Sequence, residues 1–146
     1  MSTPTLRQVD DEAMLERCWR LMAELRPQLD NPRAFAAAWQ RQRAEGYRLI
    51  ALFDDEEPLA LAGYRVQHNL MHGRFLYVDD LVTTATRRGE GLGEQLLAWL
   101  KDEARRLECG KLLLDTPLGN VLGHRFYYRH GLLAGALRFN LALDAG

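Results

Sequence analysis

The chain has 146 residues, of which 47% are hydrophobic and 27% are charged, and its formal net charge is -1. This length is typical of one domain and supports a hydrophobic core without disulfide or metal staples, so we expect a single domain over residues 1–146. Near-zero net charge, with only Lys101 and Lys111 as lysines, gives no broad positive field and argues against nucleic acid as a partner. The one serine, Ser2, lies at the terminus, which argues against a serine-nucleophile hydrolase.

The sequence indicates a protein of the reducing cytoplasm. It has no charged-then-apolar leader and no apolar run of about 18 residues, so we expect neither secretion nor membrane spanning. The cysteines Cys18 and Cys109 lack a CxxC arrangement, and we expect packed thiols. His68 and His72 fall around a predicted hairpin turn rather than on a helix, so no metal site is expected.

The first part of the chain is predicted to be helical. Apolar residues from Asp10 to Arg26 recur at three- and four-residue steps, which indicates one amphipathic helix that ends at Pro27. A second helix is predicted from Asn31, a suitable cap followed by a proline, to Gly46.

The remainder of the chain alternates strands and helices. We predict strands over 47–53, 59–68, 75–84 and 111–115, helices over 92–107 and 120–130, and one or two further strands over 132–143. The segments from 75 to 115 form a strand–helix–strand unit around a glycine loop. This order favours an α/β fold with a mixed sheet and helices on both faces.

The loop Arg87–Gly93 is a candidate phosphate-binding loop. A helix N-terminus leaves backbone N–H groups unpaired, and glycines let the backbone approach phosphate oxygens closely. A plain strand-to-helix turn is the alternative. Glu94-Gln95 stand where a Walker loop needs Lys-Ser/Thr, which disfavours nucleotide hydrolysis. This sequence also lacks the third glycine of the GxGxxG dinucleotide-binding pattern, which disfavours NAD-dependent oxidoreduction.

Two motifs give the chain a resemblance to the GNAT superfamily of N-acetyltransferases. The family signature Arg/Gln-x-x-Gly-x-Gly/Ala is matched by Arg88-Gly89-Glu90-Gly91-Leu92-Gly93, directly after a predicted strand. A second block, Asn followed seven residues later by Tyr, is matched by Asn120 and Tyr127, with Leu132 where the family usually has Phe. The resemblance implies a mixed, mostly antiparallel sheet in which one parallel strand pair splays apart.

The resemblance also implies acetyl-CoA as the co-substrate. The backbone of one splayed strand would bind the pantetheine arm and the thioester carbonyl, the glycine loop would hold the pyrophosphate, and Asn120 would contact the cofactor arm. The implied cofactor-binding residues are Leu81, Val82, Thr83, Arg88, Gly89, Glu90, Gly91, Leu92, Gly93, Glu94 and Asn120.

The resemblance assigns Tyr127 as the general acid for the leaving thiolate. Asp79 and Asp80 interrupt an apolar strand, and strand alternation would place them on opposite faces. Either carboxylate is a candidate base or substrate ligand, and pairing with an arginine is the alternative for both. His124, three residues before Tyr127, is either a proton relay or a surface histidine.

The sequence thus predicts direct transfer of an acetyl group from acetyl-CoA to a primary amine of a small molecule, peptide or protein. The alternative is a non-catalytic acyl-CoA-binding sensor or regulatory module, which would need neither Tyr127 nor Asp79. A homodimer is plausible, and the acceptor pocket has no readable code in the sequence.

Overall fold

The computed structural model describes residues 3–144, so Ser2 lies outside the described residues. The chain divides between Leu114 and Asp115 into two compact units, which are taken in turn below. Within the described residues, no helix combines the length and apolar character needed to cross a membrane.

The first unit begins with a strand and three helices. These elements are β1 (Thr5–Gln8), α1 (Glu12–Arg17), α2 (Trp19–Leu25) and α3 (Pro32–Arg43). The single helix predicted before Pro27 is wrong, because the backbone breaks at Cys18, whose N–H bonds to the Leu15 carbonyl three residues back and tightens the turn. The predicted cap of α3 is confirmed: the Asn31 side chain accepts a hydrogen bond from the N–H of Ala34.

Strand β1 and four later strands form a five-stranded sheet. Its other strands are β2 (Arg48–Asp54), β3 (Glu57–Asn69), β4 (Gly73–Thr83) and β5 (Lys111–Leu114), and the order is β1-β2-β3-β4-β5. The first four strands pair antiparallel and β4 pairs parallel with β5, so the mixed sheet is confirmed. The four-residue β1, which sequence patterning missed, covers the outer edge of β2.

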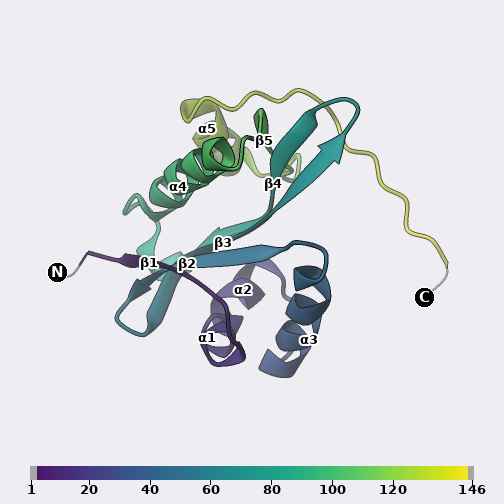
Figure 1. Cartoon of the computed structure of the whole chain (residues 1–146). Helices are drawn as coiled ribbons and strands as arrows, with labels where there is room; N and C mark the ends of the chain where they lie inside the picture. Colours follow the sequence, from purple (N-terminus) through teal and green to yellow (C-terminus); the bar gives the residue numbers. More distant parts are fainter. Residues whose placement is uncertain (1–2, 145–146) are drawn as a thin grey trace. The chain divides into compact units, whose positions relative to one another are not determined.

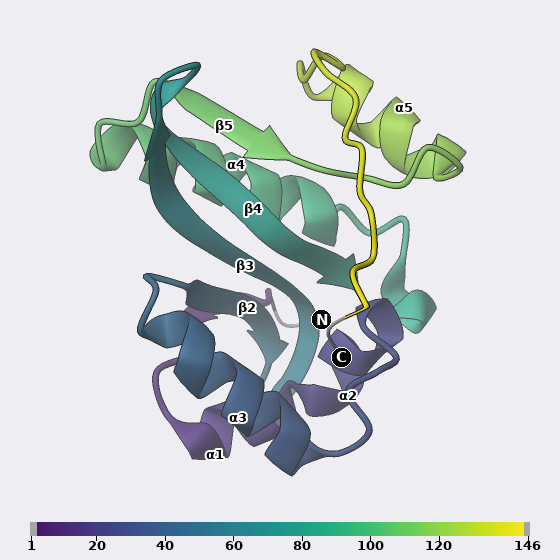
Figure 2. The same ribbon diagram turned by 90° about the vertical axis from the view of Figure 1, so that its right-hand side faces the viewer.

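Helices pack on both faces of this sheet, as predicted (Figures 1 and 2). Helices α1 to α3 cover one face, where Trp39 and Phe53 are among the buried residues. Helix α4 (Leu92–Arg106) covers the other and buries Leu96 and Leu100 against β2, β3 and β4. A polar pair crosses this second interface, because the buried Tyr64 hydroxyl donates to Glu103 at 2.8 Å.

The second unit contains helix α5 (Val121–Arg129), which was predicted, and Asn120 caps it by accepting from the N–H of Gly123. The prediction of one or two strands over 132–143 is not met, since no strand forms among residues 132–144. A strand requires a hydrogen-bonded neighbour, whereas the apolar side chains of this segment, such as Phe139 at 89% exposure, lie open to solvent.

Candidate active site

The parallel strand pair opens before β4 ends. Pairing between β4 and β5 stops at Val78 opposite Leu114, whereas β4 continues to Thr83. Residues 80–83 therefore pair with β3, and none of residues 79–83 pairs with β5. This is the splayed pair that the resemblance implied, and it leaves a free strand edge in the first unit (Figure 2).

The backbone of this edge faces outward at alternate residues. Leu61 opposes Val82, and the N–H of Thr84 donates to the Leu59 carbonyl at 2.8 Å, which fixes the phase of the ladder. The ladder therefore turns the N–H and C=O of Val82 toward β3, and those of Leu81 and Thr83 away from it. Of the three residues predicted to bind a cofactor arm, two offer free backbone groups.

The glycine loop that leads into α4 has the backbone expected of an anion cradle. Gly89 and Gly91 have positive φ angles of 85° and 80°, and a Cβ at either would meet no atom within 4 Å. Gly91 is the N-cap of α4 and has no side chain, so it caps none of the first N–H groups of the helix. Open space and unpaired donors at a helix N-terminus suit a phosphate group.

The charged residues of this loop have different surroundings. Arg87 is held by Glu90 through two contacts of 2.9 and 2.8 Å, and hydrogen bonding to that carboxylate raises the pKa of the Arg87 guanidinium. The predicted Arg88 and Glu94 are exposed beside the helix start, whereas Leu92 is buried and Gly93 half-buried. The Leu92 side chain packs against the sheet, so only its backbone is available to a ligand of the loop.

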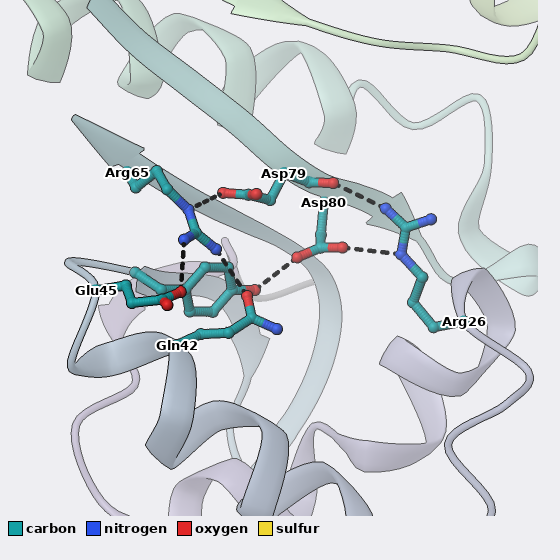
Figure 3. A network of polar contacts seen from close by, with 7 residues as sticks. Arg26, Gln42, Glu45, Arg65, Asp79 and Asp80 are labelled. Carbon is teal, nitrogen blue, oxygen red and sulfur yellow. Dashed lines mark hydrogen bonds and ion pairs between the residues drawn. The ribbon is translucent and has the colours of Figure 1, made fainter. Parts of the chain in front are cut away.

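A β-bulge in β4 determines on which face of the sheet the two aspartate side chains lie. Gly63 opposes Asp80 and Tyr64 opposes Val78, so Asp79 is an extra residue with no partner in β3. The expectation that strand alternation places Asp79 and Asp80 on opposite faces is wrong for this reason. Both carboxylates contact side chains on the face covered by α1 to α3 (Figure 3).

Asp80 is fully engaged by two partners. Its Oδ1 accepts from Arg26 Nε at 2.9 Å, and its Oδ2 accepts from the Tyr47 hydroxyl at 2.7 Å. Burial, followed by the neighbouring Asp80 carboxylate, raises the pKa of Tyr47 well above its ordinary value. The carboxylate of Asp80 is therefore a hydrogen-bond acceptor that is already committed within the protein.

Asp79 is engaged through one oxygen. Its Oδ2 accepts from Arg65 Nε at 3.0 Å, and Arg65 also donates to Gln42 at 2.8 Å and pairs with Glu45 at 3.5 Å (Figure 3). Burial raises the pKa of Asp79 above its usual range, against the opposing influence of Arg65. This carboxyl has greater tendency to hold a proton than an ordinary aspartate, which suits a group that accepts one.

The arginine partners were expected only in general terms. Arg26 follows α2 and Arg65 lies on β3, and their sequence neighbourhoods carry no signal of a contact with β4 residues more than a dozen positions away. The sequence position of Tyr47, just before β2, likewise predicts only a core aromatic residue. The bulge brings these residues together, and a bulge has no signature in this sequence beyond two adjacent acids in an apolar strand.

The remaining predicted site residues belong to the second unit. Tyr127 is half-buried on α5, and burial raises the pKa of its hydroxyl. Asn120 has a structural role as the helix cap and also donates to Thr116 at 2.9 Å. His124 Nε2 lies 3.0 Å from the carbonyl of Pro117, so this imidazole is tied to the loop that precedes the helix.

The other singled-out residues lie away from the aspartates. Cys18 is fully buried, and burial raises the pKa of its thiol to about 12, as expected of a packed cysteine. His68 is the second-last residue of β3, and His72 in the following turn lies 3.0 Å from Lys111 Nζ. Among residues 3–144, no cluster of three or more His, Cys, Asp or Glu side chains has the arrangement of a metal site.

Comparison with known sequences identifies relatives of this chain. The Acetyltransferase (GNAT) family matches residues 12–132. An uncharacterized N-acetyltransferase of Bacillus subtilis, YhdJ, is 31% identical over 122 residues, which is 84% of this chain and 86% of the relative. An aminoalkylphosphonate N-acetyltransferase of Salmonella typhimurium is 33% identical over 88 residues, or 60% of this chain and 57% of the relative.

Solved structures share the fold at low sequence identity. A transcriptional regulator from Bacillus halodurans superposes with a TM-score of 0.84 at 21% identity, covering 96% of this chain and 99% of the other. An aminoglycoside N-acetyltransferase solved with CoA gives a TM-score of 0.84 at 16% identity, covering 99% and 97%. With the family match over most of its length, the chain belongs to the GNAT family and is an acetyl-CoA-dependent N-acetyltransferase.

Proposed function

We propose that this protein transfers an acetyl group from acetyl-CoA directly to a primary amine of a small molecule or a peptide, with no covalent enzyme intermediate. The observation that carries the proposal is the free edge of β4 at Leu81 and Thr83, followed in the chain by the glycine cradle at Gly89 and Gly91. A strand edge is a suitable surface for an amide-rich arm, and a bare helix N-terminus suits a pyrophosphate.

The cofactor residues then divide the work. Acetyl-CoA, when bound, supplies an acetyl thioester and a thiolate leaving group. Leu81 and Thr83 hydrogen-bond the pantetheine arm through their outward backbone groups, and the N–H of Leu81 stabilises negative charge on the thioester oxygen. The backbone from Arg88 to Glu94 binds the pyrophosphate, and Asn120 contacts the cofactor arm through the amide atoms that its capping bonds leave available.

Proton transfers are assigned to one carboxylate and one phenol. Asp79 accepts a proton from the acceptor ammonium, directly or through one water, because its Oδ1 lies outside the contact with Arg65. The resulting neutral amine attacks the thioester carbon. The new C–N bond replaces the C–S bond, and Tyr127 donates its proton to the departing sulfur. The attacking nitrogen then loses its second proton to water, and water returns a proton to the Tyr127 phenolate. A phenol whose pKa is raised by burial stays protonated at neutral pH.

The acceptor is proposed to be a primary amine with small polar substituents. The Salmonella relative, by its name, acts on aminoalkylphosphonates. Small amines that also carry an anionic group are therefore the first acceptors to screen. Release of free thiol from acetyl-CoA reports turnover for each compound.

Calorimetric titration with acetyl-CoA tests the cofactor site. We expect saturable binding by the wild type and its loss in Gly91→Phe, because a side chain at that N-cap fills the cradle. Gly73→Phe is the matched control, since Gly73 also has a positive φ, 68°, and open space around it but lies in the β3–β4 turn. Equal loss in both variants, or no binding by a folded wild type, would overturn the proposal.

A further inference from the structure

The bulge in β4 creates a backbone carbonyl that the sheet does not satisfy. Asp79 has no partner in β3, so its carbonyl needs a donor from elsewhere. Arg26 provides that donor: its Nη2 lies 2.8 Å from the Asp79 carbonyl oxygen. The same guanidinium donates from Nε to the Asp80 carboxylate at 2.9 Å. One side chain thus grips both residues of the bulge, one through the backbone and one through the carboxylate (Figure 3).

We propose that Arg26 is a positioning residue for acetyl transfer, whose guanidinium holds the β4 bulge so that the next residues present their backbone groups to acetyl-CoA. This inference rests on the proposed use of the β4 edge. Leu81 follows directly after Asp80, and an error in the bulge would rotate its N–H and C=O. Arg26 itself acts through Asp79 and Asp80.

The planar guanidinium is suited to this task. Its donors have a fixed fork geometry, so two acceptors are held at a set spacing and orientation. A lysine ammonium at the same place is a point charge on a flexible stem. It keeps the ion pair with Asp80 but has no rigid second arm for the Asp79 carbonyl. The two interactions can therefore be separated by substitution.

The base of Arg26 is itself anchored. Its backbone N–H donates to the Met22 carbonyl at 2.8 Å as the C-cap of α2, and Pro27 follows. The loop after it is tied back to the same helix, because the Trp19 indole donates to the Leu29 carbonyl at 2.9 Å. Because the backbone of Arg26 is fixed at the end of α2, the position of α2 determines where the guanidinium meets the bulge.

The opposite side of the bulge is held by the core. Tyr47 donates to the second oxygen of Asp80 at 2.7 Å, and its ring fills the space over Gly63. Arg65 holds the Asp79 carboxylate at 3.0 Å. Arg26 thus reaches the bulge from the end of α2, while Tyr47 reaches it from the position before β2 and Arg65 from β3.

The test compares Arg26→Gln and Arg26→Lys with the wild type in acetyl-transfer kinetics and amide hydrogen exchange. We expect kcat to fall about 10- to 100-fold in both variants, since small misplacements of reacting groups have effects of this size. Acetyl-CoA affinity should fall by less than kcat does, because the glycine cradle on α4 is untouched. The matched control is Arg20→Gln on the exposed side of α2.

Hydrogen exchange supplies a readout that does not need turnover. The N–H of Val82 faces β3 next to the bulge, and we expect its exchange to accelerate about 10-fold in Arg26→Gln with no change at Ile50 on β2. Arg26→Lys keeps the ion pair and guards against simple misfolding.

Two results would overturn the role of Arg26. The first is full kcat in Arg26→Lys, which would show that the positive charge alone is enough and that the fork of the guanidinium is not needed. The second is unchanged kcat and unchanged Val82 exchange in folded Arg26→Gln. If no amine is acetylated by the wild type but Val82 exchange responds to Arg26→Gln, the proposed function fails and the clamp on the bulge stands.

Discussion

Asp79 and Asp80 are adjacent in sequence, yet their surroundings give them different capacities. Asp80 has each oxygen in a hydrogen bond, to Arg26 and to Tyr47, and its side chain is 12% exposed. Asp79 is 23% exposed and has one oxygen in its contact with Arg65. The structure therefore favours Asp79 as the residue that meets an acceptor amine, and Asp80 as part of the framework.

Substitution should separate these roles. We expect Asp79→Asn to lower kcat/KM about 100-fold with little loss of stability, because an amide cannot accept the proton. In the wild type, kcat/KM should rise with pH through the pKa of Asp79, which burial raises, since only the ionised carboxylate is a base. Asp79→Asn should lose this acid limb. A pH–rate profile with the same limb in the variant would assign the base elsewhere.

Asp80→Asn is the comparison for that experiment. It leaves the Tyr47 hydroxyl and Arg26 without their ionic acceptor, so the free energy of unfolding should drop by about 1–3 kcal/mol. Denaturant unfolding of the two variants would show the contrast. Equal destabilisation by both substitutions would contradict the division between base and framework.

Tyr127 provides a second test at the scale of one atom. Removing its hydroxyl in Tyr127→Phe should lower kcat about 100-fold and leave acetyl-CoA affinity unchanged. Tyr128, the exposed neighbour on α5, gives the control Tyr128→Phe, which should keep full activity. The two variants are compared by steady-state thiol release and by calorimetry. Unchanged turnover in an active Tyr127→Phe preparation would remove Tyr127 as the acid.

Sequence alone is informative about some of these residues and silent about others. The glycines at 89 and 91 were predicted because positive φ and an open helix N-terminus require glycine in a recognisable pattern. Arg26 and Tyr47 were missed as partners of Asp80, since their contact spans three separate elements. Local spacing encodes a loop, whereas a network assembled by tertiary packing has no local pattern to read.

At the scale of elements, the packing of Tyr47 against β3 depends on one glycine. A Cβ on Gly63 would lie 1.9 Å from the Tyr47 hydroxyl oxygen and 2.4 Å from the ring carbon that bears it. Gly63 faces Asp80 across the ladder at the bulge. The absence of a side chain there lets the Tyr47 ring reach Asp80, so this glycine couples the hairpin to the bulge.

Gly63→Ala should therefore destabilise the fold by about 1–3 kcal/mol, the range for an added group in a packed core. It should also break the contact between Tyr47 and Asp80, so the tyrosine is expected to titrate closer to its ordinary pKa. Gly135→Ala is a suitable control because no atom lies within 4 Å of a Cβ there. Thermal unfolding with ultraviolet titration measures both effects, and a Gly63→Ala protein as stable as the control would refute the coupling.

The elements that sequence reading missed have a common cause. Helices α3, α4 and α5 were predicted because caps and apolar periodicity are local signals. The break at Cys18, the short β1 and the lack of a strand in residues 132–144 depend on what other parts of the chain offer. A four-residue strand has too few positions to show alternation, and an alternating segment forms no strand without a neighbour to bond.

At the scale of the molecule, the apolar tail after α5 is unusual for a surface. Five large side chains are 67–89% exposed: Leu133, Leu137, Phe139, Leu141 and Leu143. Soluble monomers rarely keep contiguous apolar surface of this kind open to water. We expect the protein to be a homodimer that covers part of this segment.

Sedimentation equilibrium tests this expectation, with a predicted mass of twice 16.7 kDa. Leu141→Glu should shift the equilibrium to the monomer, because a charge in a buried contact is unfavourable. Leu70→Glu, at the exposed β3–β4 turn, should leave the dimer intact. A wild type that sediments as a monomer at all concentrations tested would contradict the prediction.

The sheet separates two kinds of chemistry by its faces. The aspartates contact Arg26 at the end of α2, Tyr47 just before β2 and Arg65 on β3, whereas the glycine loop begins the helix on the other face. Under the proposed function, substitutions in residues 12–45 change the surroundings of Asp79 and leave unchanged the loop that is proposed to bind the pyrophosphate of acetyl-CoA. A duplicated gene with this layout can drift toward a new amine one face at a time and retain its acetyl donor throughout.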